Sequence, residues 1–131
     1  MNGMSDASYP DDLLYHPEHD WARVEDGVAT FGITWYAQEA LGEVVFFEPP
    51  AVGGTVSKDE PYTEVESVKA VSDVVAPMSG EIVEVNTALA DSPETINDEP
   101  YGEGWLVKVK LADPDEASSL LDAAAYRALL A

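Results

Sequence analysis

The chain has 131 residues, no cysteine, and 26 acidic against 6 basic residues, which gives a formal net charge of −20 at pH 7. This length predicts one domain, and the missing cysteines exclude disulfide scaffolds, thiolate zinc sites and cysteine nucleophiles. The charge disfavours binding to nucleic acids and to anionic membranes, because both carry negative charge themselves.

The acidity has a second interpretation, which concerns the environment. Because 46% of the chain is apolar, we expect a folded protein rather than a disordered one. At about 1 M salt the Debye length is about 3 Å, so repulsion between surface carboxylates is screened. We therefore expect a protein from a halophilic prokaryote.

The chain shows no targeting or membrane-spanning pattern. Residues 1–10 read as a polar tail, without the features of a secretory signal or a transit peptide, and residues 11–131 as a single domain. No segment approaches the roughly 20 apolar residues that a membrane span needs. These patterns predict a cytoplasmic location.

The first predicted hairpin has Asp26-Gly27 at its turn, between alternating segments at 21–25 and 28–31. An Asp-Gly pair in this setting is a strong signal for a two-residue hairpin turn. A short helix is predicted over residues 35–41, because Thr34 before it is a suitable N-cap.

The middle of the chain predicts a second hairpin. Gly42 is expected to end the short helix, and the apolar run at 44–47 predicts a strand buried on both faces. Strands are then predicted at 62–66 and 71–76, with residues 67–70 at the hairpin tip.

The last part of the chain predicts two strands and a helical end. The strands at 81–85 and 106–110 show alternation of apolar and polar residues. Asp113 is a suitable cap for a helix with Pro114 at its first position. An apolar stripe over residues 120–130 predicts a helical lid packed on the sheet.

Lys69 differs from the other lysines by its place at the predicted hairpin tip. It is the only basic residue between Lys58 and Lys108, and small residues surround it. Acids lie on both sides, at Glu64, Glu66 and Asp73. By itself this position fits either a charge that limits strand aggregation or an accessible modification site.

The wider sequence favours modification. The segment from Glu66 to Asn86 resembles the lipoyl-attachment segment of glycine cleavage H proteins. Other short segments resemble further fixed blocks of that family: Gly32-Ile33-Thr34, Ala37-Gln38, Leu41-Gly42, Asp91-Ser92-Pro93, Ile96-Asn97 and Pro100-Tyr101-Gly102-Glu103-Gly104-Trp105. The resemblance extends from about residue 13 to residue 130.

This resemblance implies a fold, a cofactor and a role. The fold would be mainly β, a flattened sandwich of two antiparallel sheets with short helices and a C-terminal helical segment, as in lipoyl and biotinyl carriers. Lipoic acid would be attached to Lys69 through an amide. The chain would be a non-catalytic shuttle that transfers the aminomethyl group of glycine, and the reactive sulfurs would belong to the cofactor.

The resemblance also implies partners. These are glycine decarboxylase with pyridoxal phosphate, an aminomethyltransferase that uses tetrahydrofolate, and dihydrolipoyl dehydrogenase with FAD. A lipoate ligase or a lipoyl/octanoyl transferase would attach the cofactor. Tethering keeps the cargo at high local concentration at each partner.

By the same match, Glu18, Asp20 and Asp73 are candidates for docking the charged end of the loaded arm, with Glu66 close by. A protonated amine pairs with carboxylates, and partial desolvation strengthens the pairing. Asp20 stands where the family usually has the longer glutamate, and Trp35 where it often has an acid. No catalytic residue and no metal ligand is predicted.

Other carriers and other classes of protein stay open. Biotin domains typically set the lysine between methionines, and lipoyl domains of oxoacid dehydrogenases usually place aspartate before it, whereas Val68 and Ala70 flank Lys69 here. An H-like protein that mainly relays lipoate is a further alternative. His16 and His19 are compatible with a metal site, although ordinary turns share this spacing.

Two more alternatives depend on the acids. Glu64 and Glu66 point the same way on a predicted strand and are compatible with an acid–base pair of an enzyme. In so acidic a chain such pairs also arise by chance. An unmodified acidic interaction module is the last alternative.

Overall fold

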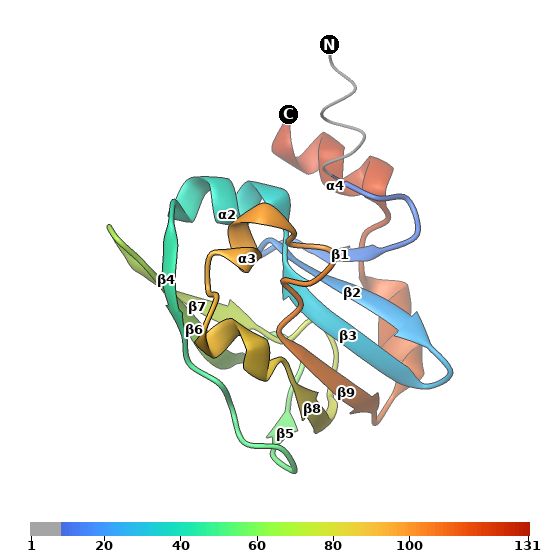
Figure 1. The fold of residues 1–131 in the computed structure, drawn as a ribbon. Coiled ribbons are helices and arrows are strands. Elements are labelled where there is room, and N and C mark those ends of the chain that lie inside the picture. Colours follow the sequence, from blue (N-terminus) through green and yellow to red (C-terminus); the bar gives the residue numbers. More distant parts are fainter. Residues whose placement is uncertain (1–8) are drawn as a thin grey trace.

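Two antiparallel sheets face each other in the computed structural model, which describes residues 9–131 (Figure 1). The larger sheet has six strands in the order β1-β2-β3-β9-β8-β5, and the smaller has three in the order β4-β6-β7. The strands are β1 Leu14–His16, β2 Asp20–Glu25, β3 Val28–Ile33, β4 Val44–Phe47, β5 Thr55–Val56, β6 Pro61–Ser67, β7 Val71–Val75, β8 Gly80–Val85 and β9 Val107–Leu111. This arrangement confirms the predicted sandwich.

Short helices connect and cover the strands. They are α2 Trp35–Leu41, the 3₁₀ helix η1 Thr87–Ala90, α3 Thr95–Asp98, the 3₁₀ helix η2 Pro114–Ser119, and α4 Ala123–Leu130. Figure 1 shows α4 beside the segment that leads into β1, while the β6–β7 tip points away on the other side of the molecule. None of the described helices is long and apolar enough to cross a membrane.

The local predictions for the N-terminal half are confirmed. Asp26 and Gly27 both have positive φ, 54° and 80°, as the two-residue turn between β2 and β3 requires. The Thr34 hydroxyl accepts a hydrogen bond from the Ala37 N–H and caps α2 at the predicted residue. Gly42 ends this helix, with φ of 86°.

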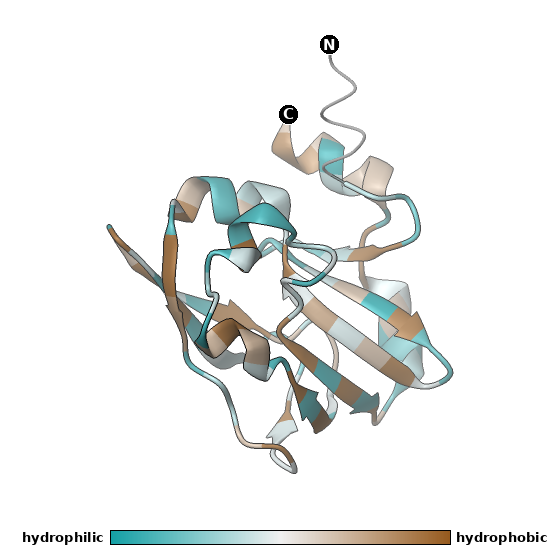
Figure 2. Cartoon of the chain, viewed as in Figure 1, coloured by the Kyte–Doolittle hydropathy of each residue, from teal (hydrophilic) through white to brown (hydrophobic). Residues whose placement is uncertain are grey.

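The core between the sheets follows from strand alternation. In β6, Thr63, Val65 and Ser67 are buried while Glu64 and Glu66 are exposed. In β9, Val107 and Val109 are buried, and Figure 2 shows apolar and polar residues alternating along this strand. The inward-facing side chains of both sheets form one apolar cluster.

The prediction for β4 is wrong in one respect. The run 44–47 forms a strand, but Val45 and Phe46 are 44% and 47% exposed. β4 is an edge strand of the three-stranded sheet, and its pairing with β6 shifts between Val44 and Phe46. An apolar run alone does not distinguish an edge strand from a central one, since packing decides which residues are covered.

The C-terminal lid is divided, which the apolar stripe does not reveal. Asp113 caps η2 and Asp122 caps α4, and between them Leu121 pairs with Tyr15. α4 buries Tyr126 in a second apolar cluster, behind β1 and β2, rather than on the core between the sheets. α4 therefore covers the outer side of the larger sheet, whereas Leu120 packs against the core between the sheets.

Residues 1–8 of the predicted tail lie outside the described residues. Tyr9, which we had assigned to that tail, is only 7% exposed, and its ring lies edge-on to Tyr15 and Tyr126. The strands β1 and β5 and the helices η1 and α3 have no counterpart among the predicted elements, because each is only two to four residues long.

Candidate functional site

Lys69 lies at the exposed tip of the β6–β7 hairpin, and Ser67 orders that tip. The Ser67 hydroxyl oxygen accepts hydrogen bonds from the backbone N–H groups of Lys69 and Ala70, at 3.2 and 3.0 Å. The Ser67 N–H donates to the Ala70 carbonyl at 2.7 Å. The Lys69 ammonium forms no ion pair with any residue between 9 and 131. The backbone is therefore held while the amine stays accessible.

The tip is tied to the body beside the end of α2. The Val68 N–H donates to the Glu43 carbonyl at 3.0 Å. The Asn97 side chain donates to the Gly42 carbonyl and accepts from the Val44 N–H, both at 2.8 Å. Asn97 thus links α3 to the segment that contacts the tip.

Gly42 gives the Lys69 side chain room. A Cβ atom at position 42 would lie 3.3 Å from Cε of Lys69, which is a tight contact. The stem of the lysine therefore passes close to the backbone at the end of α2. The φ of 86° also favours glycine here.

A small cleft lies between the sheets, next to the end of α2, and holds a cavity of about 30 Å³. Its walls include Ile33 of β3, Leu41 of α2 and Val65 of β6. Glu18, Asp20 and Asp73 supply acidic groups to the same cleft. An apolar wall with converging carboxyl groups suits a flexible apolar arm that ends in a cation.

The structure thus brings three of the four predicted docking residues together and leaves out the fourth. Glu66 alternates with Val65 on β6, so it lies on the outer face of the smaller sheet, beside Phe46 and Val71 in the register. Glu64 faces the same way, as the strand pattern predicts. Asp73 pairs with Glu64, so the register gives it the outer face as well, but it lies on the edge strand β7 and lines the cleft from there.

The cleft lies within reach of an arm attached at the tip. Asp73 is four residues beyond Lys69, and a strand rises about 3.3 Å per residue, so the two are about 13 Å apart along the chain. Leu41 lines the cleft and is adjacent to Gly42, where an added Cβ would lie 3.3 Å from Cε of Lys69.

Asp20 is the most unusual group of the cleft. It is 1% exposed, and neither of its carboxyl oxygens has a hydrogen-bond partner among the described residues. Burial raises the pKa of Asp20 well above the usual range, because the charged form is deprived of water. The position suits a carboxylate that receives its donor from a ligand.

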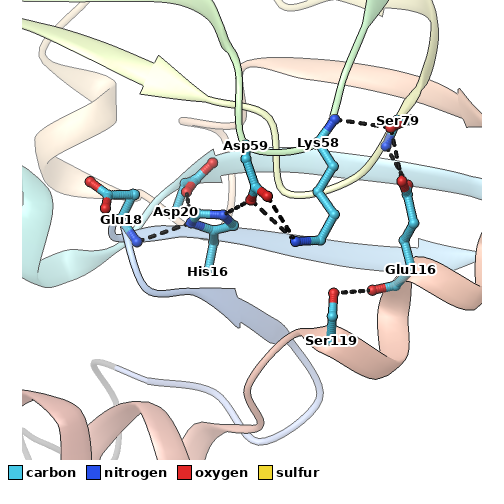
Figure 3. Close-up of polar contacts among 8 residues, drawn as sticks. All are labelled: His16, Glu18, Asp20, Lys58, Asp59, Ser79, Glu116 and Ser119. Atoms are coloured by element: carbon cyan, nitrogen blue, oxygen red, sulfur yellow. Dashed lines mark hydrogen bonds and ion pairs between the residues drawn. The ribbon is translucent and has the colours of Figure 1, made fainter.

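His16 holds the turn that carries Glu18 and Asp20 (Figure 3). Its Nδ1 accepts from the Glu18 N–H at 3.0 Å, so the ring proton is on Nε2, which donates to Asp59 at 2.6 Å. This bond, with a second one from Lys58, lowers the pKa of Asp59. Because Nδ1 is already occupied and lies 3.8 Å from Asp20, it does not satisfy that carboxyl group.

The second histidine has a separate role. Nδ1 of His19 lies 2.7 Å from the Tyr126 hydroxyl, which also contacts the Thr34 hydroxyl at 2.9 Å. Burial lowers the pKa of His19. His16 and His19 therefore have different partners, and residues 9–131 contain no group of three or more side chains placed to hold a metal ion.

Several residues of the site were not assigned a role from the sequence. Ser67, Asn97 and Gly42 belong to blocks that resemble the family, but their pattern does not show that all three surround the tip lysine. For His16, the sequence indicates only a possible metal ligand. Long-range contacts of this kind have no local signal, since they depend on which strands become neighbours.

Comparisons with known proteins agree with this geometry. The family model described as "Glycine cleavage H-protein" matches residues 13–131. The chain is 55% identical to the glycine cleavage system H protein of Symbiobacterium thermophilum over 122 residues, 93% of this chain and 95% of the relative. It is 56% identical to that of Escherichia coli O7:K1 over 125 residues, 95% and 97% of the two chains.

A solved structure supports the same relationship. The crystal structure of a glycine cleavage system H protein from Mycobacterium marinum superposes with a TM-score of 0.84 and is 46% identical. The match covers 91% of this chain and 96% of the other. The family match over residues 13–131 includes both the tip and the cleft.

Proposed function

The chain belongs to the glycine cleavage H-protein family, and we propose on that basis that Lys69 is its lipoyl-attachment residue. The protein is a non-catalytic, lipoyl-carrying shuttle that moves the aminomethyl group of glycine from the decarboxylase to the aminomethyltransferase. The observation that carries the residue assignment is the accessible amine of Lys69, held on an ordered tip beside a cleft with an unpartnered carboxyl group.

The cofactor supplies what the chain lacks. Lipoate in amide linkage brings a pair of sulfur atoms that carries the cargo and is reoxidised, in a chain without cysteine. The partners are the pyridoxal-phosphate decarboxylase, the tetrahydrofolate-dependent aminomethyltransferase, the flavin-containing dihydrolipoyl dehydrogenase and a lipoate ligase. Each must reach the tip, and an exposed hairpin end allows this.

The residues of the chain fit such an arm. The absence of a Cβ at Gly42 leaves space for the lysine stem, and Ile33, Leu41 and Val65 form an apolar wall for the hydrocarbon part. The acidic groups Asp20 and Asp73 accept a protonated amine at the far end. In this cleft the chain orients the arm and excludes water from its charged end.

The first prediction tests the attachment residue. Protein made with lipoate and a lipoate ligase should gain one lipoyl group, and Lys69→Arg should lose it completely, because a guanidinium does not form the amide. Intact-mass measurement reads the result. Lys58→Arg is the matched control, since Lys58 is also in a turn but pairs with Asp59 at 3.1 Å. If the mass gain persists in Lys69→Arg, the assignment is wrong.

We infer, second, that the acidic surface is an adaptation to concentrated salt, and that the protein acts in the cytoplasm. With 26 acidic and 6 basic residues, most carboxylates have no cation to pair with. The pairs Lys108–Glu84 and Arg127–Asp11 are long, at 3.8 and 3.7 Å, and well exposed. Such pairs contribute little to stability, so repulsion between carboxylates dominates the surface.

This inference predicts that the melting temperature rises with KCl far beyond physiological strength. The Debye length falls from about 10 Å at 0.1 M to about 3 Å at 1 M, which removes most of the repulsion. Thermal unfolding followed by circular dichroism across this range measures the effect, with sucrose as a control for general solute exclusion. A melting temperature that stays flat or falls would exclude salt adaptation and leave the carrier function unaffected.

A further inference from the structure

The described residues contain three buried side-chain oxygen atoms without a hydrogen-bond partner, and they belong to only two residues. Two are the carboxyl oxygens of Asp20, and the third is the hydroxyl of Tyr62. Native proteins satisfy most buried polar atoms, so each exception calls for an explanation. The sequence assigns no role to Tyr62, which is one polar residue within a predicted strand.

The strand register places these two groups on facing sides of the core. Asp20 pairs with Ile33, and Ala22 pairs with Phe31, so Asp20 and Phe31 lie on the same inner face of the larger sheet. Tyr62 comes from the smaller sheet, at the irregularity between Pro61 and Thr63 that turns its side chain. Its ring meets the Phe31 ring edge-on, with 6.0 Å between the centroids.

The hydroxyl of Tyr62 is therefore buried in the core, against the inner face of the larger sheet that also carries Asp20. Burial raises the pKa of Tyr62, and the charge of Asp20 raises it further, as expected of a phenol close to a carboxylate. Asp20 itself lines the cleft.

Two other donors close to Asp20 in the described part of the chain are already engaged. Nδ1 of His16 accepts from the Glu18 N–H, and the Tyr126 hydroxyl is engaged by His19 and Thr34. Glu18 and Asp59 carry the same charge as Asp20 and oppose its ionisation. A phenol is a good donor, whereas an ionised carboxylate only accepts, so Tyr62 and Asp20 are chemically matched.

We propose that Tyr62 is a positioning residue of the arm-docking cleft, whose hydroxyl donates a hydrogen bond to the Asp20 carboxylate when that carboxylate receives a protonated amine from the cleft. This inference rests on the proposed function. One carboxylate oxygen then faces the amine and the other faces the phenol. Tyr62 acts through Asp20 and does not touch the arm.

The polar atoms of Tyr62 and Asp20 have no partner among the described residues, and they pair when Asp20 is ionised, as it is when it receives the amine. An unpartnered buried hydroxyl costs stability, so Tyr62→Phe, which removes only that oxygen, should leave the unmodified protein as stable as wild type or more so. The same change should weaken docking of the loaded arm. A purely structural hydroxyl would give the opposite sign for stability.

The experiment compares Tyr62→Phe, Asp20→Asn and the double variant, each lipoylated and loaded by the decarboxylase, which is then removed. We expect Tyr62→Phe to shorten the lifetime of the loaded form about tenfold, as for a lost hydrogen bond to a charged group, and to have no further effect in the Asp20→Asn background. Tyr15→Phe is the matched control, since its hydroxyl donates to the Pro10 carbonyl in the other apolar cluster.

A second readout needs no cofactor. Titration of the Asp20 carboxyl group by NMR in the unmodified protein should show a higher pKa in Tyr62→Phe than in wild type, because the ionised form loses its donor. An unchanged Asp20 pKa, or a Tyr62→Phe effect on lifetime that persists in the Asp20→Asn background, would overturn the inference. If instead Asp20→Asn leaves the lifetime unchanged, the docking role of the cleft fails, and the titration alone decides the role of Tyr62.

Discussion

Alanine at position 32 should destabilise the protein by about 2–4 kcal/mol, through overpacking and a lost hydrogen bond. Gly32 pairs directly with Trp21 across β2 and β3, and a Cβ atom there would lie 2.6 Å from two carbon atoms of the indole ring. Trp21 is completely buried and its indole N–H donates to the Pro100 carbonyl at 3.0 Å. The ring cannot move without breaking that bond.

Denaturant unfolding of the unmodified protein measures this cost. Gly27→Asn is the matched control, because a Cβ at Gly27 meets nothing within 4 Å and asparagine tolerates positive φ. We expect that variant to stay within about 0.5 kcal/mol of wild type. An equal, small loss in both variants would show that the strands adjust around Trp21.

The Gly32 contact also has a consequence for the site. Trp21 is adjacent to Asp20 on β2, so a displaced ring moves the strand that carries the buried carboxyl group. Phe31 and Ile33, on either side of Gly32, face the core between the sheets, whereas Gly32 faces Trp21. Ile33 also lines the cleft, so β3 links the Trp21 contact to the cleft wall. Stability and arm docking should therefore fall together in Gly32→Ala.

The sequence predicts those parts of the fold whose cause is local. The turn at Asp26-Gly27, the cap at Thr34 and the end at Gly42 each depend on one or two residues with strong conformational preferences. The tip position of Lys69 follows from alternation in the two flanking strands. The assignment of a lipoyl group to Lys69 depends on the resemblance to a family, because the position of the lysine alone fits two interpretations.

The parts that the sequence misses depend on neighbours distant in the chain. Glu66 and Asp73 look alike as acids beside Lys69, yet only Asp73 reaches the cleft, because β7 is an edge strand and β6 lies between two partners. The exposure of Phe46 has the same origin. Tyr62 packs on Phe31, on the face that carries Asp20, only because two sheets close over each other, and no spacing along the chain encodes that contact.

Asparagine in place of Asp20 should change the pH dependence of stability. Burial raises the pKa of Asp20 in the folded protein above its unfolded value near 3.8. Its contribution to stability is therefore fully present below the unfolded pKa and is lost as the pH rises through the folded pKa. Asp20→Asn should thus become more stable relative to wild type as the pH rises above the unfolded pKa and through the folded one, measured as the difference between their unfolding free energies. Because both proteins contain the other acids, the difference between their unfolding free energies cancels the contribution of those acids to the pH dependence.

The same substitution should shorten the lifetime of the loaded shuttle, which is the largest functional effect we expect. The cargo is lost by hydrolysis to formaldehyde and ammonia whenever the arm leaves the cleft, so the rate of loss follows the undocked fraction. A buried charge-assisted hydrogen bond suggests a decrease of about tenfold to a hundredfold for Asp20→Asn. Asp73 is exposed, and Asp73→Asn should cost about twofold to fivefold.

The measurement is the release of ammonia and formaldehyde after the decarboxylase is removed, with the extent of lipoylation checked by mass in every sample. Asp91→Asn, an exposed acid at the end of η1, controls for the loss of one charge. Glu66→Gln should release its cargo at the wild-type rate, because Glu66 lies on the outer face of the smaller sheet. Wild-type lifetimes in Asp20→Asn, Asp73→Asn and their combination would mean that the arm docks elsewhere. An Asp20→Asn protein that becomes more stable at high pH and yet loses its cargo faster would show that the carboxyl group is kept for the ligand and not for the fold.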